Sequence, residues 1–195
     1  MFQRWGLSVE GADCSPAMIE RARRAYGESP SLRWAVRSFD QPIAVDPPFD
    51  AALCVGNSLA LAAYRAMVQR TIQRMLDAVR PGGIAVTHVL NLWRLPDGPC
   101  VWQKCQRANL PQGEVLIVKG VHRCGERGFV DLIVAGLSPA TGMHTESVPL
   151  LGLEAEELTQ LVRAAGASRS ELFGGYHGEA YARESSKDLI LVAFR

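Results

Sequence analysis

The chain has 195 residues, 48% of them hydrophobic, and a formal net charge of +1. This length allows one domain with a hydrophobic core, and the near-neutral charge, without basic runs or acidic tails, gives no reason to expect a nucleic-acid or membrane partner. No apolar run approaches the length of a membrane span, and the N-terminus lacks the apolar segment of a signal peptide.

The cysteines point to a reducing compartment. Five are scattered along the chain, without a C-x-x-C pair or a recognised metal-binding spacing. They are Cys14, Cys54, Cys100, Cys105 and Cys124. Scattered thiols in odd number are typical of cytosolic proteins, so we expect a cytoplasmic protein with free cysteines and no metal site.

The first half of the chain alternates between strand and helix patterns. β-forming residues lead into a first strand at 6–11. Ser15 and Pro16 then supply the cap and first position of a helix that runs to Tyr26 and ends at Gly27. A second strand, a Pro-rich loop and a third, almost wholly apolar strand follow at 32–36, 42–48 and 49–55.

An apolar stripe marks the next helix. Its members recur at helical spacing and are Val68, Ile72, Met75, Leu76 and Val79. Pro81-Gly82-Gly83 ends this helix, and another apolar strand follows at 84–90. The alternation of strands and helices predicts an α/β fold with a doubly wound, mostly parallel sheet.

The pattern changes after Asn91. Residues 93–113 look irregular, and three strand patterns with Gly-bearing turns follow at 114–123, 128–137 and 144–150. We expect an antiparallel β insertion at about 92–152. A helix at 154–165 and two strands at 168–173 and 188–194 complete a single domain that spans 1–195.

Four motifs occur in a familiar order: G-x-D-x-S-x-x-M-I from Gly11, F-D at Phe39, P-F-D-A-A-L-C-V-G-N-S from Pro48, and V-R-P-G-G from Val79. In this order they resemble the class I S-adenosylmethionine-dependent methyltransferases, and the G-N-S turn is similar to that of glycine N-methyltransferase and its bacterial relatives. The resemblance covers 6–91 well and extends loosely to Arg195. It implies a Rossmann-like fold and S-adenosylmethionine as the cofactor.

One part of the family pattern is absent. The family begins with a central strand and a glycine-rich G-x-G-x-G loop, and no such loop precedes Val9. The resemblance therefore implies an N-terminally truncated methyltransferase fold, through either a start codon that lies upstream or a natural truncation. The strands at 6–11 and 49–55 are then expected either to pair with each other or to keep open edges, and the cofactor to bind weakly or not at all.

Asp13 stands at the carboxyl end of a strand, where ligands bind in open α/β sheets. The resemblance implies that it binds the ribose hydroxyls, and the alternative is a solvated turn residue. The resemblance places Cys14 and Met18 on the adenine side, and Met18 is equally well interpreted as a core residue.

The resemblance implies further cofactor residues in two later turns. Asp40, flanked by Phe39 and Gln41, is expected to accept a hydrogen bond from the adenine amino group, and its alternative is a solvated loop position. Val55 and Gly56 are expected to run along the methionine portion.

Asn57 matches an acceptor-binding position of glycine N-methyltransferase, and its alternative is a helix cap. Leu61 replaces a histidine of that family, which argues against a glycine-like acceptor. Weaker acceptor candidates, at strand ends or in the insertion, are Asn91, Arg94, Arg123 and Tyr176. The insertion is expected to cover the acceptor site, with Arg123 meeting an acidic acceptor, or else to form a homo-oligomer interface.

No catalytic residue is assigned, because the cofactor itself carries the reactive methyl group. The four histidines, His88, His122, His144 and His177, show neither catalytic nor metal-like spacing.

The expected function is methyl transfer from S-adenosylmethionine to a small polar acceptor by direct displacement. The alternative is an inactive remnant that acts as a binding or interaction module. A nucleotide-binding oxidoreductase is disfavoured because the glycine-rich loop is absent and the P-F-D and G-N-S motifs are present.

Overall fold

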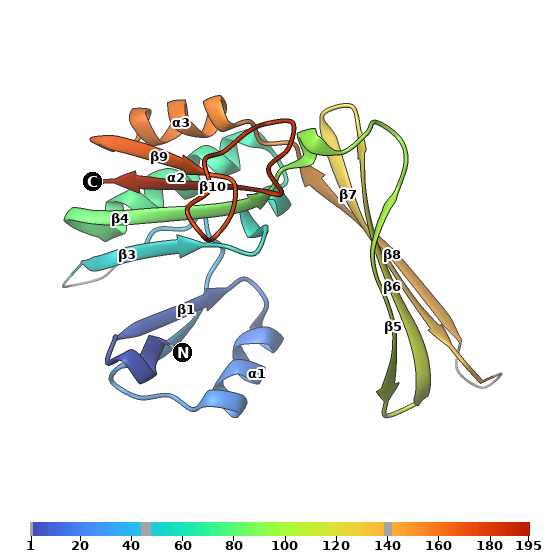
Figure 1. Cartoon of the computed structure of the whole chain (residues 1–195). Helices are drawn as coiled ribbons and strands as arrows, with labels where there is room; N and C mark the ends of the chain where they lie inside the picture. The colour runs from blue at the N-terminus through green and yellow to red at the C-terminus, as the bar shows by residue number, and fades with distance from the viewer. Residues whose placement is uncertain (1, 44–47, 139–141) are drawn as a thin grey trace.

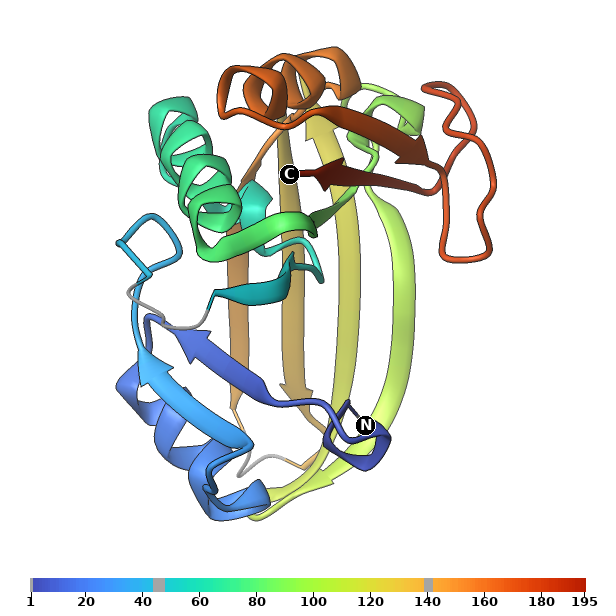
Figure 2. The ribbon, with the colours of Figure 1, turned by 90° about the vertical axis from the view of Figure 1, so that its left-hand side faces the viewer.

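Three β-sheets form the framework of the chain in this computed structural model, which describes residues 2–43, 48–138 and 142–195. Figure 1 shows a small N-terminal unit below an α/β core, with a long antiparallel sheet standing beside both. The view in Figure 2 agrees, because the long strands run past both parts. Most of the Pro-rich loop expected at 42–48 lies outside the described residues.

The N-terminal unit is a parallel strand pair with one helix. Its elements are η1 (Phe2–Trp5), β1 (Val9–Asp13), α1 (Pro16–Tyr26) and β2 (Leu32–Val36). Val9 of β1 lies opposite Leu32 of β2. The predicted α1 is confirmed, since Ser15 caps it by accepting a hydrogen bond from the Met18 N–H. The strand expected at 6–11 instead begins at Val9 and runs to Asp13.

The core is a four-stranded sheet with helices packed on it. Its elements are β3 (Phe49–Cys54), η2 (Ser58–Leu61), α2 (Arg65–Ala78), β4 (Val79–Leu90), α3 (Ala155–Ala164), β9 (Arg169–Phe173) and β10 (Asp188–Phe194). The strand order is β3-β4-β10-β9, with β3 and β4 parallel and β10 antiparallel to both of its neighbours. Val79, expected on the helix, instead begins β4, which therefore starts before the predicted position 84.

The expectation of one mostly parallel sheet needs correction. The described part of β1 pairs only with β2, and the described part of β3 pairs only with β4, so the edges of β1 and β3 do not meet. The core sheet is mixed because β10 enters between β4 and β9 in the opposite direction.

The third sheet is the expected insertion. It follows η3 (Leu92–Arg94) and contains β5 (Val101–Leu110), β6 (Gly113–Cys124), β7 (Arg127–Gly136) and β8 (Met143–Leu151), paired antiparallel in that order. The antiparallel meander is confirmed, but the prediction of irregular structure at 93–113 is wrong for β5. This strand is polar and mostly exposed at the sheet edge, so its order comes from backbone pairing with β6 rather than from an apolar pattern.

One hydrophobic cluster joins the core to the third sheet. Leu59, Val68 and Leu158 are fully buried in it, together with Val121 of β6 and Leu150 at the end of β8. The end of the third sheet that carries Val121 and Leu150 is therefore packed against the core. None of the described helices has the length and hydropathy that a membrane-spanning helix needs.

Candidate functional site

A tight turn after β3 forms the centre of the candidate site. Gly56 and Asn57 both have left-handed backbone conformations, with φ of +73° and +75°. The Gly56 N–H donates to Nδ1 of His88, 3.1 Å away, and the Asn57 N–H donates to the His88 carbonyl oxygen at 3.1 Å. The neighbouring strand β4 therefore fixes the shape of this turn.

The Asn57 side chain helps to fix the same turn. Its Oδ1 accepts a hydrogen bond from the Leu90 N–H at 3.0 Å. Asn57 occupies the cap position of η2 but makes no side-chain capping bond there, so the capping alternative is wrong. Its carboxamide is instead hydrogen-bonded to β4, and this bond holds the turn after β3 against β4.

His88 connects this turn to the C-terminal part of the chain. The Tyr176 hydroxyl lies 2.8 Å from Nδ1, and Nε2 faces Asp188 Oδ1 at 3.2 Å without the alignment of a hydrogen bond. Because a backbone N–H already donates to Nδ1, this nitrogen is an acceptor, the neutral ring carries its proton on Nε2, and Tyr176 donates. Partial burial, and then the nearby Asp188 carboxylate, raise the pKa of Tyr176.

Sequence reasoning missed His88. A single histidine in an apolar strand carries no motif, and its partners come from a turn 32 residues earlier and a loop 88 residues later. Tyr176 was predicted as a weaker acceptor-binding candidate, and in the structure its hydroxyl contacts His88. Its side chain is 67% exposed, which leaves the phenol reachable from outside.

Asp13 lies where it was expected, at the end of β1. Its Oδ1 accepts from the Ser15 N–H at 2.8 Å, and Oδ2 has no hydrogen-bond partner among the described residues. Cys14 and Met18 beside it are exposed, so the core alternative for Met18 is wrong. Figure 1 shows β1, β3 and β4 running in the same direction, so Asp13 and the Gly56–Asn57 turn lie at the same ends of their strands.

Asp40 is held by two partners. Ser38 Oγ donates to Oδ1 at 2.7 Å, and Arg70 Nε and NH2 donate to Oδ2 at 3.3 and 3.1 Å. The Ser38 hydrogen bond, and then Arg70, lower the pKa of Asp40. The alternative of a freely solvated loop residue is therefore wrong. Phe39 packs against the core cluster, and Gln41 Oε1 accepts from the Ser38 N–H.

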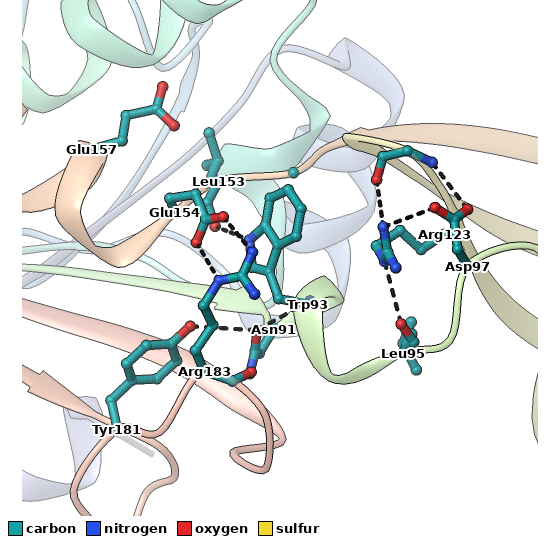
Figure 3. A network of polar contacts seen from close by, with 12 residues as sticks. Asn91, Trp93, Leu95, Asp97, Arg123, Leu153, Glu154, Glu157, Tyr181 and Arg183 are labelled. Carbon is teal, nitrogen blue, oxygen red and sulfur yellow. Dashed lines mark hydrogen bonds and ion pairs between the residues drawn. The ribbon is translucent and has the colours of Figure 1, made fainter.

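Asn91 is enclosed by the protein, as Figure 3 shows. Its Nδ2 donates to the carbonyl oxygens of Arg183 and Ser186, both at 2.8 Å, and its Oδ1 accepts from the Trp93 N–H and the Tyr181 hydroxyl. The expected acceptor contact is therefore corrected to a structural role, because these bonds use the donors and lone pairs of the carboxamide. Asn91 ties the 174–187 loop to the end of β4.

The Arg123 side chain likewise binds other residues of the protein. Its guanidinium donates to the carbonyl oxygens of Leu95 and Gly125 and pairs with Asp97 at 3.2 Å (Figure 3). The expected contact with an acidic acceptor is thus replaced by an ion pair at the β6–β7 turn. Arg94, also proposed for the acceptor, has a buried Nε without a hydrogen-bond partner among the described residues.

Trp93 lies at the junction between the core and the third sheet. Its indole N–H donates to the Leu153 carbonyl oxygen at 3.2 Å, and the Arg183 guanidinium lies over its ring at 4.6 Å. Glu154 accepts from Arg183 Nε and NH2 (Figure 3). This network fixes the 174–187 loop, and thereby Tyr176, relative to the strand ends.

Comparison with known proteins finds one matching family model and similar solved structures. Residues 1–83 match the family model described as a methyltransferase domain. The sugar N-methyltransferase KedS8 of Streptoalloteichus matches with a TM-score of 0.74 and 20% identity, covering 95% of this chain and 70% of its own. The structural likeness shows a shared fold, and the family model matches the N-terminal part of the chain. Comparison with curated proteins finds no match.

Two further structures share this methyltransferase fold. CalS10, an amino pentose methyltransferase of Micromonospora echinaspora involved in calicheamicin biosynthesis, matches with a TM-score of 0.69 and 20% identity, covering 96% of this chain and 74% of its own. The methyltransferase CcbJ of Streptomyces caelestis matches at 0.73 and 17% identity, covering 98% and 76%. CalS10 was solved with S-adenosylmethionine bound.

Proposed function

We propose that this methyltransferase transfers a methyl group to a small polar acceptor that carries an amine. The observation that carries the proposal is the Gly56–Asn57 turn, fixed by His88 at the end of β3 with the Tyr176 hydroxyl beside it. Bound S-adenosylmethionine would supply a methyl group activated by its sulfonium, for direct displacement by the acceptor. The chain's own residues then have to orient the acceptor and manage its proton.

The cofactor-binding part of the proposal uses three turns. Asp13 keeps one carboxylate oxygen without a partner among the described residues, which suits a pair of ribose hydroxyls, with Cys14 and Met18 beside it. The second turn, Phe39-Asp40-Gln41, is proposed to face the adenine. The third, Val55-Gly56, is proposed to follow the methionine portion, where a residue without a side chain allows a close approach.

The acceptor-binding part of the proposal rests on Tyr176 and His88. The phenol donates to Nδ1 of a neutral imidazole whose other nitrogen faces Asp188. An acceptor amine at the phenol oxygen could pass its proton to that oxygen while the phenol proton moves to Nδ1, which then gives up the hydrogen bond from the Gly56 N–H. The Asp188 carboxylate stabilises the resulting imidazolium. Asn57 is proposed to border the same space.

The chemical class of the acceptor is supported by the neighbouring structures. Two of them are named as methyltransferases of an amino pentose and of a sugar nitrogen. The narrower resemblance to glycine N-methyltransferase remains a prediction, and Leu61 in place of the family's histidine argues against glycine itself. We therefore propose an amino sugar or a similar hydroxylated amine.

The experiment measures transfer of labelled methyl groups from S-adenosylmethionine to amino sugars, amino alcohols and glycine. Tyr176→Phe should lower kcat about 100-fold, the contribution typical of a positioned acid–base group. His88→Gln should lower it similarly, because Tyr176 loses the nitrogen that accepts its proton. His144→Gln, on the exposed part of β8, should leave the rate unchanged.

The interaction-module alternative rests on one observation, the unpaired edges of β1 and β3 within the described residues. Calorimetric titration with S-adenosylhomocysteine separates the two hypotheses. Binding with methyl transfer supports the enzyme, and binding without transfer to any amine refutes the acceptor class. Absence of both would favour the interaction module.

A further inference from the structure

A cluster of three chemically different side chains lies on the third sheet, away from the turn after β3. Val121 and Val130 are paired across β6 and β7 and belong to the cluster that packs against the core. Since side chains alternate along a strand, His122 and Asp131 project from the opposite face. We call this opposite face, with Trp102, His122 and Asp131, the outer face.

Cys100 joins these two residues just before β5. Its Sγ lies 3.9 Å from Asp131 Oδ2, and His122 Nδ1 lies 2.8 Å from the same oxygen. The three atoms all lie within 4.8 Å of one another. They line a pocket of about 390 Å³ whose wall also contains Trp102 and Ser147.

The surroundings orient each member of the cluster. Ser147 Oγ donates to the second oxygen of Asp131 at 2.7 Å, and the Phe129 ring stacks on His122 at 4.9 Å. Gly120 makes room for the thiol, because a Cβ at this position would lie 2.4 Å from Cys100 Sγ. Four neighbouring segments thus contribute to one arrangement: Cys100 lies just before β5, β6 and β7 carry the ring and the carboxylate, and β8 carries Ser147.

We propose that Cys100 Sγ, His122 Nδ1 and Asp131 Oδ2 bind a transition-metal ion of the zinc class. A thiolate, an imidazole and a carboxylate suit Zn²⁺, whereas Mg²⁺ and Ca²⁺ select oxygen ligands. Zinc bonds of about 2.0 to 2.3 Å place tetrahedral ligands roughly 3 to 4 Å apart. Only a small inward movement of Cys100, and a slight opening of the His122–Asp131 contact, would therefore be needed.

Binding has a defined proton balance. The Cys100 thiol loses one proton to solvent, and the neutral His122 ring moves its proton from Nδ1 to Nε2, so that Nδ1 coordinates the ion. Three protein ligands leave the fourth tetrahedral position open toward the pocket, where a water molecule completes the shell. Because two ligands come from the neighbouring strands β6 and β7 and the third from the residue before β5, the ion would cross-link the sheet and stabilise it.

The experiment titrates Co²⁺ into the reduced, tag-free full chain and follows its absorption spectrum. A site of this kind gives tetrahedral visible bands and a thiolate-to-cobalt charge-transfer band in the near ultraviolet, which saturate at one equivalent and disappear when Zn²⁺ is added. Cys100→Ser should abolish the charge-transfer band. Cys105→Ser, an exposed thiol on the same sheet edge, should retain it.

Two further variants separate ligation from folding. Ser147→Ala should weaken binding roughly 10-fold, the usual cost of losing a group that orients a metal ligand. Gly120→Ala should also weaken it by displacing the thiol, with circular dichroism confirming that the sheet remains folded. Absence of the charge-transfer band in the wild-type chain, or its persistence in Cys100→Ser, would overturn the proposal and leave a polar cluster. Neither result depends on methyl transfer.

Discussion

The core and the N-terminal unit use the same kinds of elements but bury very different amounts of apolar surface. In the core, Val68, Leu158 and Leu189 are completely buried. In the described part of the N-terminal unit, Ile19 and Leu32 are the buried hydrophobic residues, whereas five large ones are exposed. These are Trp5, Leu7, Met18, Tyr26 and Val36. Burial of apolar surface supplies most of the stability of a fold, so the difference predicts that the N-terminal unit opens locally at lower cost than the core.

The largest effect is expected in the core. Leu158→Ala should lower the free energy of unfolding by about 3 kcal/mol, because it leaves a cavity in a fully buried position. Urea unfolding measures this change. Leu7→Ala, at a half-exposed position of the N-terminal unit, is the matched control and should cost less than about 1 kcal/mol. Equal losses in the two variants would contradict the comparison.

Shortening a buried side chain of the N-terminal unit should destabilise that unit locally. Ile19 is 3% exposed and anchors α1, so Ile19→Ala should lower the free energy of local opening by about 2 kcal/mol. Hydrogen exchange should speed up in β1, α1 and β2 and stay unchanged in β4 and β10. Met18→Ala, one residue earlier and half-exposed, should change neither set. Faster exchange throughout the core would mean that the two parts unfold together.

The Asp40–Arg70 ion pair links the loop after β2 to α2 of the core. The pKa of Asp40 is lowered in the folded chain, so this contact stabilises the fold above the ordinary aspartate pKa and is lost as the pH falls through the lowered value. Asp40→Asn should therefore lower the urea midpoint modestly at about pH 7 and little at about pH 3. Asp50→Asn, in an exposed pair with Arg80, should have little effect at either pH. A larger deficit in acid would refute the sign.

The smallest effect compares one thiol from each part. Burial raises the pKa of the Cys54 thiol to about 11, whereas Cys14 lies exposed after β1. Since the thiolate is the reactive form, a disulfide reagent at mildly alkaline pH should modify Cys14 quickly and Cys54 only after unfolding. Peptide mapping by mass spectrometry measures both. Rapid labelling of Cys54 in the native protein would show that the core opens as readily as the N-terminal unit.

Sequence patterns predicted the elements that have a strong local signal. Ser15, Pro16 and Gly27 defined α1, and β2 and β10 were predicted with their observed ends. The strand β5 was missed because its side chains are polar and its order comes from hydrogen bonds with β6. Val79 was placed on a helix because its apolar spacing continued, although the chain turns into β4 there.

The predicted functional residues also divide into those with a local sequence motif and those without one. Asp13 and Asn57 were predicted because motifs next to strand ends have a recognisable spacing, and the structure has Asp13 at the end of β1 and Asn57 in the turn after β3. Arg123 and Asn91 were predicted from position alone, and their side chains are bound to the protein. The direction of a side chain depends on neighbours that are distant in sequence, so position in the chain could not decide it.

The sequence by itself determined the alternation of helices and strands, the antiparallel insertion and the methyltransferase motifs, because each depends on residues close together in the chain. Tertiary structure alone decided the mixed core sheet, the contact of His88 with Tyr176 and Gly56, and the cluster of Cys100, His122 and Asp131. The physical reason is that strand pairing joins residues of large sequence separation. Register and direction, rather than spacing, then place their functional atoms within bonding distance.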